Sequence, residues 1–449
     1  MSRKHRILLV NPPIHDFAAY DFWLRPCGLL TVAGQLRGQA EFLFFDYLDR
    51  LRGNCGLRIS DCGLSSDGPF NPQSAIPNPQ SDRWGRGPFP FERIPSPAPV
   101  KDIPRHFRRF GWPRADFQAY LSAHSPFDCA LVQTVMTYWY PGVAEVIEDV
   151  RHFCPGTPIV LGGNYATLCL EHARRLGGDL VVVGSDLQSV WQLLGVTPDL
   201  EQPALWEVYD SLRTGAIKLS DGCPFRCSYC SVPKVYAGFN PRPLGRALAE
   251  LELLVKCGAQ NVAFYDDALL FDAERVLVPF LREVIRRDIH VNLHTPNALN
   301  ARFLTTELAD LMVRAGFKTF YLGFESAEPQ WQQCTGGKVF SEELGQSVKH
   351  LLAAGADAAN ITAYQILGHP GSDSQELEAS MRFVHSLGIR GMLADFSPIP
   401  GTPDGEACRR WVDIDEPLMH NKTAFPIIRL GFDEVNRLKD LQRQLNCDL

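Results

Sequence analysis

The sequence predicts an α/β protein in which a doubly wound parallel sheet precedes a second series of strand–helix units. Two observations support this. In the first 200 residues, five short apolar runs alternate with helical patterns. Between residues 201 and 400, six more strand candidates alternate with amphipathic helices. We therefore expect a domain over residues 1–200, a second domain over residues 201–400 and a C-terminal extension over residues 401–449.

The strands of the first domain are expected where apolar runs end at glycine, proline or polar residues. They are residues 6–10 (RILLV), 41–45 (EFLFF), 128–133 (DCALVQ), 158–161 (PIVL) and 180–183 (LVVV). Helical patterns lie between several of them, as at residues 29–36 and 142–153. Ligands of such sheets bind at the carboxyl ends of strands, so the loops after Val10, Val132 and Leu161 are the expected ligand edge.

One stretch interrupts this pattern. Residues 54–100 are rich in proline, glycine and serine, and two short motifs recur there seven residues apart. The prolines forbid a helix, so we interpret the stretch as a low-complexity, mostly disordered insertion. Cys55 and Cys62 lie inside it and lack further ligands nearby, so we do not expect them to bind a metal.

Composition limits the classes of function. The net charge of −7 argues against a protein that coats nucleic acid, because phosphate binding needs a cationic face. Residues 103–114 do interleave arginines with aromatic residues, which leaves two alternatives, single-stranded nucleic acid or pairing with local acids. No run approaches the ~18 apolar residues of a membrane span, and the amino terminus does not resemble a signal peptide. We expect a cytoplasmic location.

The 13 cysteines are an odd number spread over a long chain, so a disulfide framework is a poor interpretation. Cys223, Cys227 and Cys230 stand out because they have the spacing C-x3-C-x2-C on a loop directly after a strand candidate. Thiolates this close either share one inorganic centre or remain inert thiols. Structural zinc needs four protein ligands, and no fourth cysteine or histidine follows within the next twenty residues.

A [4Fe–4S] cluster normally takes four thiolates, so three would leave one iron open to an outside ligand. S-adenosylmethionine (SAM) can chelate such an iron through its amino and carboxylate groups. An electron from the cluster would then cleave the S–C5′ bond and release a 5′-deoxyadenosyl radical. The loop resembles the signature of the radical SAM superfamily, in which an aromatic residue precedes the third cysteine, and Tyr229 matches it. The resemblance implies that Cys223, Cys227 and Cys230 are the metal ligands and the catalytic centre.

The second series of strands is expected at residues 216–220, 261–265, 290–294, 318–322, 360–367 and 391–396. Six strand–helix units in a row resemble the partial (β/α)6 TIM-type barrel of radical SAM enzymes. In barrels the chemistry lies at the carboxyl ends of the strands, where the cysteine loop is expected.

The resemblance also implies cofactor-binding residues at other strand ends. Asp266 and Asp267 occupy the place where the family binds the amino group of SAM, although they can equally be solvated acids. Glu325, in a motif that begins at Gly323, is implied to lie near the ribose, with a structural salt bridge as the alternative. Gly368 is implied to let the backbone approach the adenine, and a plain tight turn is its alternative.

Polar side chains near the expected strand ends are candidates for substrate contact, or else satisfied core groups. Cys334 is a candidate hydrogen-atom donor or a bystander thiol. The substrate candidates are His294, Asn297, Tyr321, Tyr364, Gln365, His369 and Asp395.

A doubly wound, Rossmann-like (flavodoxin-like) domain before such a barrel resembles the subgroup of the family with an N-terminal cobalamin-binding domain. Residues 9–13, 26–29 and 161–163 carry this resemblance, as does the bridging run 203–210. The motif D-x-H-x-x-G, whose histidine binds cobalt from below, is absent: only His290 has an aspartate two residues before it, and Leu293 replaces the glycine. Cobalamin is thus expected without that ligand, or the domain is a vestigial sheet that shapes substrate access.

The functional expectation is a radical SAM enzyme with a small-molecule substrate, in the form of a cobalamin-dependent C-methyltransferase. An enzyme of radical rearrangement, cyclisation or epimerisation without cobalamin is the first alternative, and a non-catalytic iron–sulfur electron-transfer or sensor protein is the second. The resemblance further implies an electron donor such as flavodoxin or ferredoxin, and no nucleic acid.

Overall fold

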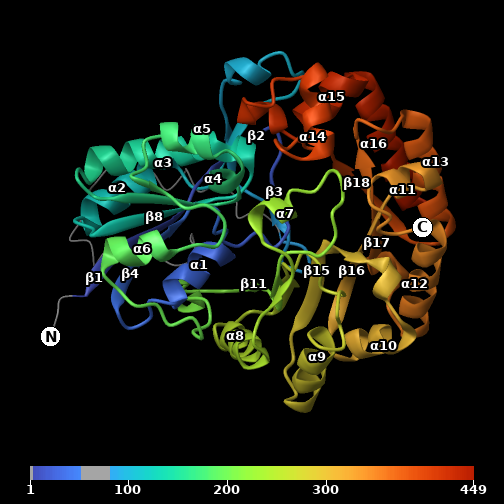
Figure 1. Cartoon of the computed structure of the whole chain (residues 1–449), viewed down its shortest axis with the longest axis horizontal. Helices are drawn as coiled ribbons and strands as arrows, with labels where there is room; N and C mark the ends of the chain where they lie inside the picture. Colours follow the sequence, from blue (N-terminus) through green and yellow to red (C-terminus); the bar gives the residue numbers. More distant parts are fainter. Residues whose placement is uncertain (1–3, 52–80) are drawn as a thin grey trace. The chain divides into compact units, whose positions relative to one another are not determined.

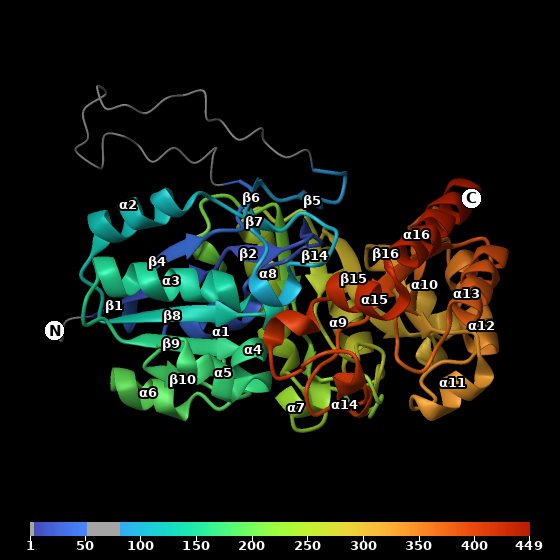
Figure 2. The same ribbon diagram turned by 90° about the horizontal axis from the view of Figure 1, so that it is seen from above.

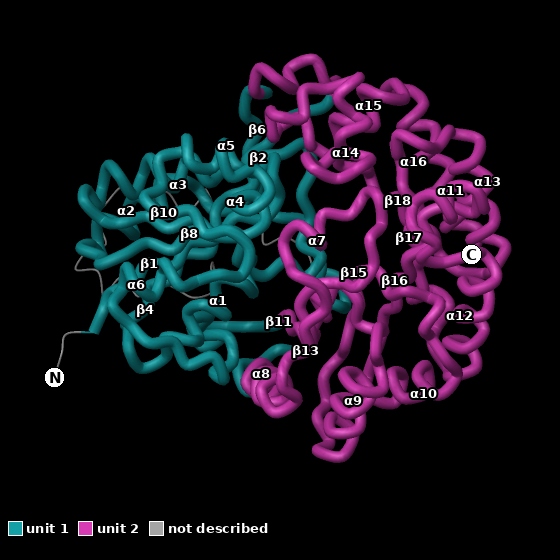
Figure 3. Tube along the Cα trace, viewed as in Figure 1, with its two compact units in different colours: residues 1–96, 105–213, 256–259 teal, residues 97–104, 214–255, 260–449 magenta. Residues whose placement is uncertain are grey.

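The computed structural model describes residues 4–51 and 81–449, so Cys55 and Cys62 lie outside the described residues. The chain divides into two compact units, shown in teal and magenta in Figure 3. Unit 1 comprises residues 1–96, 105–213 and 256–259. Unit 2 comprises residues 97–104, 214–255 and 260–449.

The core of unit 1 is a five-stranded parallel sheet in the order β10-β9-β8-β1-β4. The strands that follow β1 in the chain are added first on one side of it, as β4, and then on the other, beginning with β8. This is the flavodoxin-like strand order. Each strand begins and ends within two residues of its predicted bounds, so the predicted doubly wound sheet is confirmed. The strands are β1 (His5–Asn11), β4 (Ala40–Asp46), β8 (Cys129–Thr134), β9 (Ile159–Gly163) and β10 (Leu180–Val181).

Helices cover both faces of this sheet, because its strands are apolar on both sides. One face packs against α2 and α3 through a core that includes Phe117, Val146 and Val150. The other packs against α1 and α6 through Leu29 and Trp191. Figure 1 shows these two layers. The helices of unit 1 are α1 (Cys27–Gly34), α2 (Arg114–His124), α3 (Tyr140–Phe153), α4 (Asn164–Leu168), α5 (Leu170–Arg175) and α6 (Gln188–Leu194).

Residues 81–100 are folded, so the prediction of a low-complexity insertion reaching residue 100 is wrong for this part. The aromatic residues explain the difference: Phe89 is buried, and the Trp23 indole N–H donates to the Trp84 carbonyl oxygen at 2.8 Å. These contacts anchor a chain that is otherwise rich in proline and glycine. A short antiparallel ladder joins β5 (Gly87–Pro88) to β3 (Tyr20–Asp21). In a second, β7 (Arg108–Phe110) lies between β6 (Phe91–Arg93) and β2 (Ile14–Asp16) and pairs with both.

The arginines of the basic and aromatic segment pair with acids of α3. Arg109 Nη2 lies 2.7 Å from Glu145 Oε1, and both side chains are buried. Arg114 Nη2 lies 2.8 Å from Asp149 Oδ1. These two guanidiniums follow the second alternative, pairing with local acids.

Unit 2 is built on a six-stranded parallel sheet in the order β11-β14-β15-β16-β17-β18. All six strands were predicted, and the curved sheet has helices along its outer side (Figure 1). The strands are β11 (Thr214–Ile217), β14 (Asn261–Phe264), β15 (Asn292–Asn300), β16 (Phe317–Glu325), β17 (Ile361–Leu367) and β18 (Arg390–Asp395). The helices up to the last strand are α7 (Val232–Val235), α8 (Leu244–Lys256), α9 (Leu277–Arg286), α10 (Thr306–Arg314), α11 (Pro329–Cys334), α12 (Ser341–Ala353) and α13 (Ser374–Ser386).

The C-terminal segment completes the edge of this sheet. Its helices are α14 (Pro403–Ala407), α15 (Ala424–Leu430) and α16 (Phe432–Cys447). Helix α16 packs on β18 and α13. Figure 2 shows α16 beside α13. The Asn446 side chain exchanges two 2.9 Å hydrogen bonds with the Gly391 backbone, as a neighbouring strand would. The exposed edge of β18 is thereby partly covered. Within the described ranges, no helix is long and apolar enough to cross a membrane.

Candidate functional site

The cysteine loop leaves the sheet of unit 2 at the carboxyl end of β11. It lies between two short strands, β12 (Ser220–Asp221) and β13 (Asn240–Pro241), which pair in antiparallel fashion. At its start Gly222 has φ +80°, and a Cβ at this position would lie 2.0 Å from the Gly238 carbonyl oxygen. Only glycine fits there, so the first cysteine is positioned by a backbone turn.

Two carboxylates fasten the base of this loop. Asp266 is buried and accepts hydrogen bonds from the Leu219 and Ser220 backbone N–H groups and from Ser220 Oγ, at 2.7–3.0 Å. Burial raises the pKa of Asp266 to about 6. Asp267 Oδ2 accepts from the Gly222 N–H at 3.3 Å. Both residues were predicted to bind the SAM amino group, and the structure shows them holding the strand-to-loop junction.

The three predicted ligands are free thiols of intermediate exposure. Burial raises the pKa of each, to about 11 for Cys230, and the charges of Cys223 and Cys227 raise that of Cys230 further. Lys338 acts in the opposite direction on all three. The net shift favours the protonated thiols, and the charge of Lys338 favours the thiolates that a metal centre takes.

The described residues hold no preformed metal site. In residues 4–51 and 81–449, no three His, Cys, Asp or Glu side chains form a group that could hold a metal ion. The assignment of Cys223, Cys227 and Cys230 thus rests on donor type, spacing, shared electrostatics and place at the strand end.

Glu325 and Lys338 form a half-buried pair beside the cysteine loop. Lys338 Nζ lies 3.7 Å from Glu325 Oε1. Burial raises the pKa of Glu325, while the charge of Lys338 and a hydrogen bond from Tyr229 oppose the rise. Glu325 has φ +71°, an unfavourable conformation for a residue other than glycine, which is typical of functional sites. A Cβ at Gly323 would lie 2.9 Å from Lys338 Nζ, so a side chain there would displace the lysine head group.

His369 and Asp404 form a second polar pair at the end of β17. His369 Nε2 lies 2.9 Å from Asp404 Oδ2, and the same oxygen accepts a 2.6 Å hydrogen bond from Ser228 Oγ in the cysteine loop. The neighbouring Gly368 has φ +84°, and a Cβ there would lie 2.9 Å from Pro426. Close backbone approach at Gly368 is thus observed, toward α15.

The other predicted substrate contacts differ in their surroundings. His294 is fully buried and bonded to Thr319 Oγ1 and Asn261 Oδ1, so it is a satisfied core group. Tyr321 stacks on Tyr364 with ring centroids 5.6 Å apart. Three others bond to neighbouring groups: Asn297 and Gln365 donate to the carbonyl oxygens of Tyr265 and Ala363, and Asp395 accepts from Lys439. Cys334, the candidate hydrogen-atom donor, is exposed at the end of α11.

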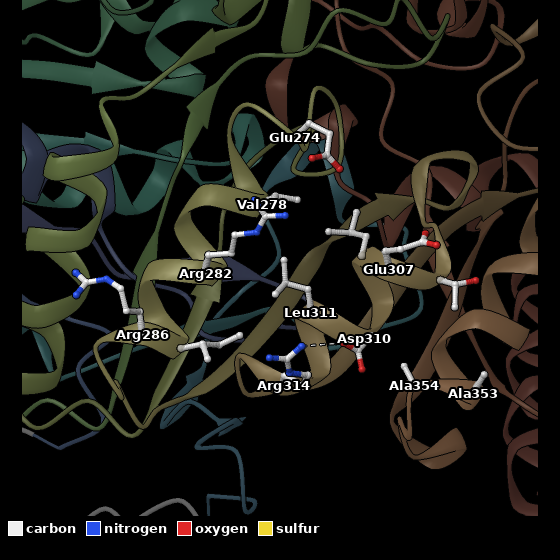
Figure 4. A pocket seen from close by; sticks show the side chains of 13 residues that line it. Glu274, Val278, Arg282, Arg286, Glu307, Asp310, Leu311, Arg314, Ala353 and Ala354 are labelled. Carbon is white, nitrogen blue, oxygen red and sulfur yellow. Dashed lines mark hydrogen bonds and ion pairs between the residues drawn. The ribbon is translucent and has the colours of Figure 1, made fainter.

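A large surface pocket lies elsewhere in unit 2, in the helical layer. It measures about 750 Å³ and is lined by residues of α9, α10 and the end of α12 (Figure 4). Its charged groups are mixed in sign, for example Arg282 beside Glu274 and Arg314 paired with Asp310. No predicted site residue lines it, so we do not assign it to the chemistry.

In unit 1, the strand order reverses between the carboxyl ends of β1 and β8, where Asn11 and Thr134 lie. Asp46 accepts from Asn11 Nδ2 at 2.7 Å and from the Tyr209 hydroxyl at 2.6 Å. Gly163 has φ +125° and packs against the Thr134 backbone. In sheets of this topology ligands bind at this edge. His15 Nε2 lies 3.3 Å from Glu145 Oε2, and His172 Nδ1 lies 2.6 Å from the Tyr165 hydroxyl.

Residues 217–384 match the family model described as the radical SAM superfamily. The chain contains a radical SAM domain. The matched residues hold the cysteine loop and the strands from β14 to β17, so the predicted resemblance is confirmed.

Two curated relatives share part of the chain. Hopanoid C-2 methylase of Rhodopseudomonas palustris is 32% identical over 200 residues, which is 38% of this chain and 37% of that protein. The uncharacterized methyltransferase PH0819 of Pyrococcus horikoshii is 26% identical over 196 residues, 43% of this chain and 41% of that protein. The chain spans about two fifths of the length of these relatives.

Solved structures extend the similarity to both units. The radical SAM methyltransferase TsrM of Kitasatospora setae, with cobalamin and a [4Fe–4S] cluster bound, matches with a TM-score of 0.65 at 15% identity. The match covers 98% of this chain and 91% of TsrM. The cobalamin-dependent radical enzyme OxsB matches with a TM-score of 0.55 at 12% identity, over 98% of this chain and 61% of OxsB. The fold of a Rossmann-like sheet followed by a radical SAM barrel is therefore shared.

Sequence reasoning missed Lys338, Asp404 and Ser228. The one sequence feature that pointed to Lys338 was the pair of glycines before it. In the structure both glycines have positive φ, and Gly336 packs against Cys227. Nothing around Asp404 in the sequence indicated a contact with the cysteine loop.

Proposed function

We propose that this protein is a radical SAM enzyme that transfers a methyl group to carbon with the help of cobalamin. One observation carries the proposal: the C-x3-C-x2-C loop lies at the carboxyl end of the first barrel strand, in a chain that matches the fold of TsrM over 98% of its length. Cys223, Cys227 and Cys230 would hold a [4Fe–4S] cluster, which when bound would offer an open iron to SAM and the electron for its reductive cleavage.

The chain's own residues bind and orient SAM in this proposal. Lys338 offers a positive charge for the SAM carboxylate, and Glu325 offers an acceptor for the ribose hydroxyls. Asp267 remains the candidate for the amino group. Gly368 and the neighbouring apolar residues at the end of β17 border the adenine. Tyr229, which is largely buried, excludes water between the second and third cysteines.

We place cobalamin at the edge of the unit 1 sheet where the strand order reverses. When bound, it would supply the methyl group to be transferred. The loops after β1, β8 and β9 would border it, and the sequence contains no D-x-H-x-x-G motif to offer cobalt a histidine. An electron donor of the flavodoxin or ferredoxin type would reduce the cluster, and the substrate would be a small molecule.

A second candidate is radical rearrangement, cyclisation or epimerisation without cobalamin. The missing D-x-H-x-x-G histidine favours it.

The test is anaerobic purification from cells supplied with cobalamin, followed by iron, sulfide and corrinoid quantification. We expect near four iron atoms per chain, retained cobalamin, and 5′-deoxyadenosine or a methylated product from SAM. C227A should lose iron and SAM cleavage, whereas C334A, which removes an exposed thiol outside the loop, should keep both. Full cleavage by C227A would refute the site, and a loaded cluster without corrinoid would favour the second candidate.

A further inference from the structure

One carboxylate of the C-terminal segment joins the cysteine loop to the turn after β17. Asp404, on α14, accepts at the single oxygen Oδ2 from Ser228 Oγ (2.6 Å) and from His369 Nε2 (2.9 Å). Its backbone N–H also donates to the Ser228 carbonyl oxygen at 3.2 Å. Burial alone would raise the pKa of Asp404, but these hydrogen bonds outweigh it and lower the pKa. The group is a carboxylate at neutral pH.

The direction of the hydrogen bonds around His369 is fixed by chemistry. Its Nδ1 atom accepts from the Trp331 indole N–H at 3.1 Å and from the Gly371 backbone N–H at 3.0 Å. Both groups are donors only, so Nδ1 carries no proton and the ring proton lies on Nε2, which donates to Asp404. His369 is therefore held as a donor to the carboxylate.

The hydrogen bonds from His369 through Asp404 end at Ser228, between the second and third cysteines of the loop. Ser228 and Tyr229 occupy that interval, and the Tyr229 ring stacks on Trp331 with centroids 6.1 Å apart and an interplanar angle of 18°. Tyr229 also contacts His369 edge-on at 6.2 Å. Polar and aromatic contacts thus fix the same short stretch, which carries two of the proposed metal ligands.

We propose that Asp404 is a positioning residue that holds the cysteine loop in line with the turn at residues 368–371, so that the cluster and the SAM site are aligned by the C-terminal segment. The inference rests on the proposed function for its ligand. Asp404 touches no reacting atom. It acts by accepting from the half-buried Ser228 hydroxyl and from the ring N–H of His369, which is buried.

The test compares D404N, D404A, S228A and the double variant D404N/S228A with D415N as a control. Asp415 lies in the same segment, where it pairs with the exposed Arg409. Each protein is loaded anaerobically, its iron is counted, and the electron paramagnetic resonance of the reduced cluster is recorded with and without SAM. The dissociation constant for SAM is obtained by titrating that spectral change.

We expect all variants to keep their iron, because the three cysteines remain. D404A should bind SAM about tenfold more weakly and show an altered spectral response, since hydrogen bonds to a charged group are lost. D404N should lie between D404A and the wild type, because an amide oxygen still accepts but more weakly. KM for SAM should change more than kcat, and D415N should match the wild type.

The double variant makes the test specific. If Ser228 and Asp404 act through their shared hydrogen bond, the losses of SAM binding in D404N and S228A should not add, and D404N/S228A should bind SAM more tightly than the product of the two single effects predicts. Additive losses, or wild-type SAM binding by D404N and D404A, would overturn the inference. If D404A does not fold, SAM binding by S228A, D404N and D404N/S228A still tests the inference. A wild type that holds iron but shows no response to SAM would instead overturn the proposed function.

Discussion

Lys338 Nζ lies 3.7 Å from Glu325 Oε1, which joins the end of β16 to the loop after α11. The pair is mostly shielded from water, with exposed fractions of 22% for the Lys338 side chain and 11% for that of Glu325. The charges of Glu325 and the three cysteines raise the pKa of Lys338 against the effect of its burial. The cation is thus shared between a carboxylate and the proposed cluster ligands.

Replacement of Lys338 by methionine should destabilise the protein by about 3 kcal/mol. Methionine keeps much of the apolar stem but leaves the Glu325 carboxylate buried without its cation. The measurement is urea unfolding at pH 7, followed by tryptophan fluorescence. R314M, which removes an exposed arginine from its pair with Asp310, should change stability little. Equal effects of the two variants would show that the Glu325 pair is energetically unimportant.

Asp266 should make stability fall as pH rises from about 4 to about 6. Its pKa in the folded protein is about 6 against an ordinary value of 3.8, so over this interval the folded state binds more protons than the unfolded state. At 1.36 kcal/mol per pH unit, the wild type should lose up to about 3 kcal/mol relative to D266N. Urea unfolding of both proteins at several pH values measures this difference.

Asp221 provides a comparison of opposite sign. Its pKa is lowered to about 2, against the effect of burial, by Lys218 and Arg242. The advantage of the wild type over D221N should therefore stay constant between pH 4 and 6 and decline only below about pH 4. If the D266N and D221N differences followed the same pH dependence, the assignment to Asp266 would be wrong.

The sequence was sufficient to predict the eleven strands of the two large sheets, because each is a short apolar run bounded by glycine, proline or polar residues. The proposed cluster ligands were also predictable, since Cys223, Cys227 and Cys230 lie within eight residues and their spacing is itself the signal. Both kinds of feature are local along the chain.

Contacts between distant segments were not predictable in the same way. Lys338 follows Cys230 by 108 residues (338 − 230), and Asp404 follows Ser228 by 176. For His294, the sequence could not decide between substrate contact and a core position for another reason. The pairing of β15 with β16 shifts register between Leu293 and His294, so simple alternation does not tell which face the histidine takes. Its bonds to Thr319 and Asn261 place it in the core.

Gly222 should be indispensable for the cysteine loop. G222A would introduce a Cβ 2.0 Å from the Gly238 carbonyl oxygen and 2.8 Å from the Tyr236 side chain, in a residue with φ +80°. The backbone before Cys223 must then move, and we expect a loss of most of the iron after anaerobic reconstitution. G238A is the matched control, because Gly238 has a similar φ of +77° but nothing within 4 Å of the added Cβ. It should carry only the backbone cost of about 1 kcal/mol and keep its iron. Because the two variants share the backbone cost, a normal iron content in G222A would mean that the tight turn does not position the first ligand.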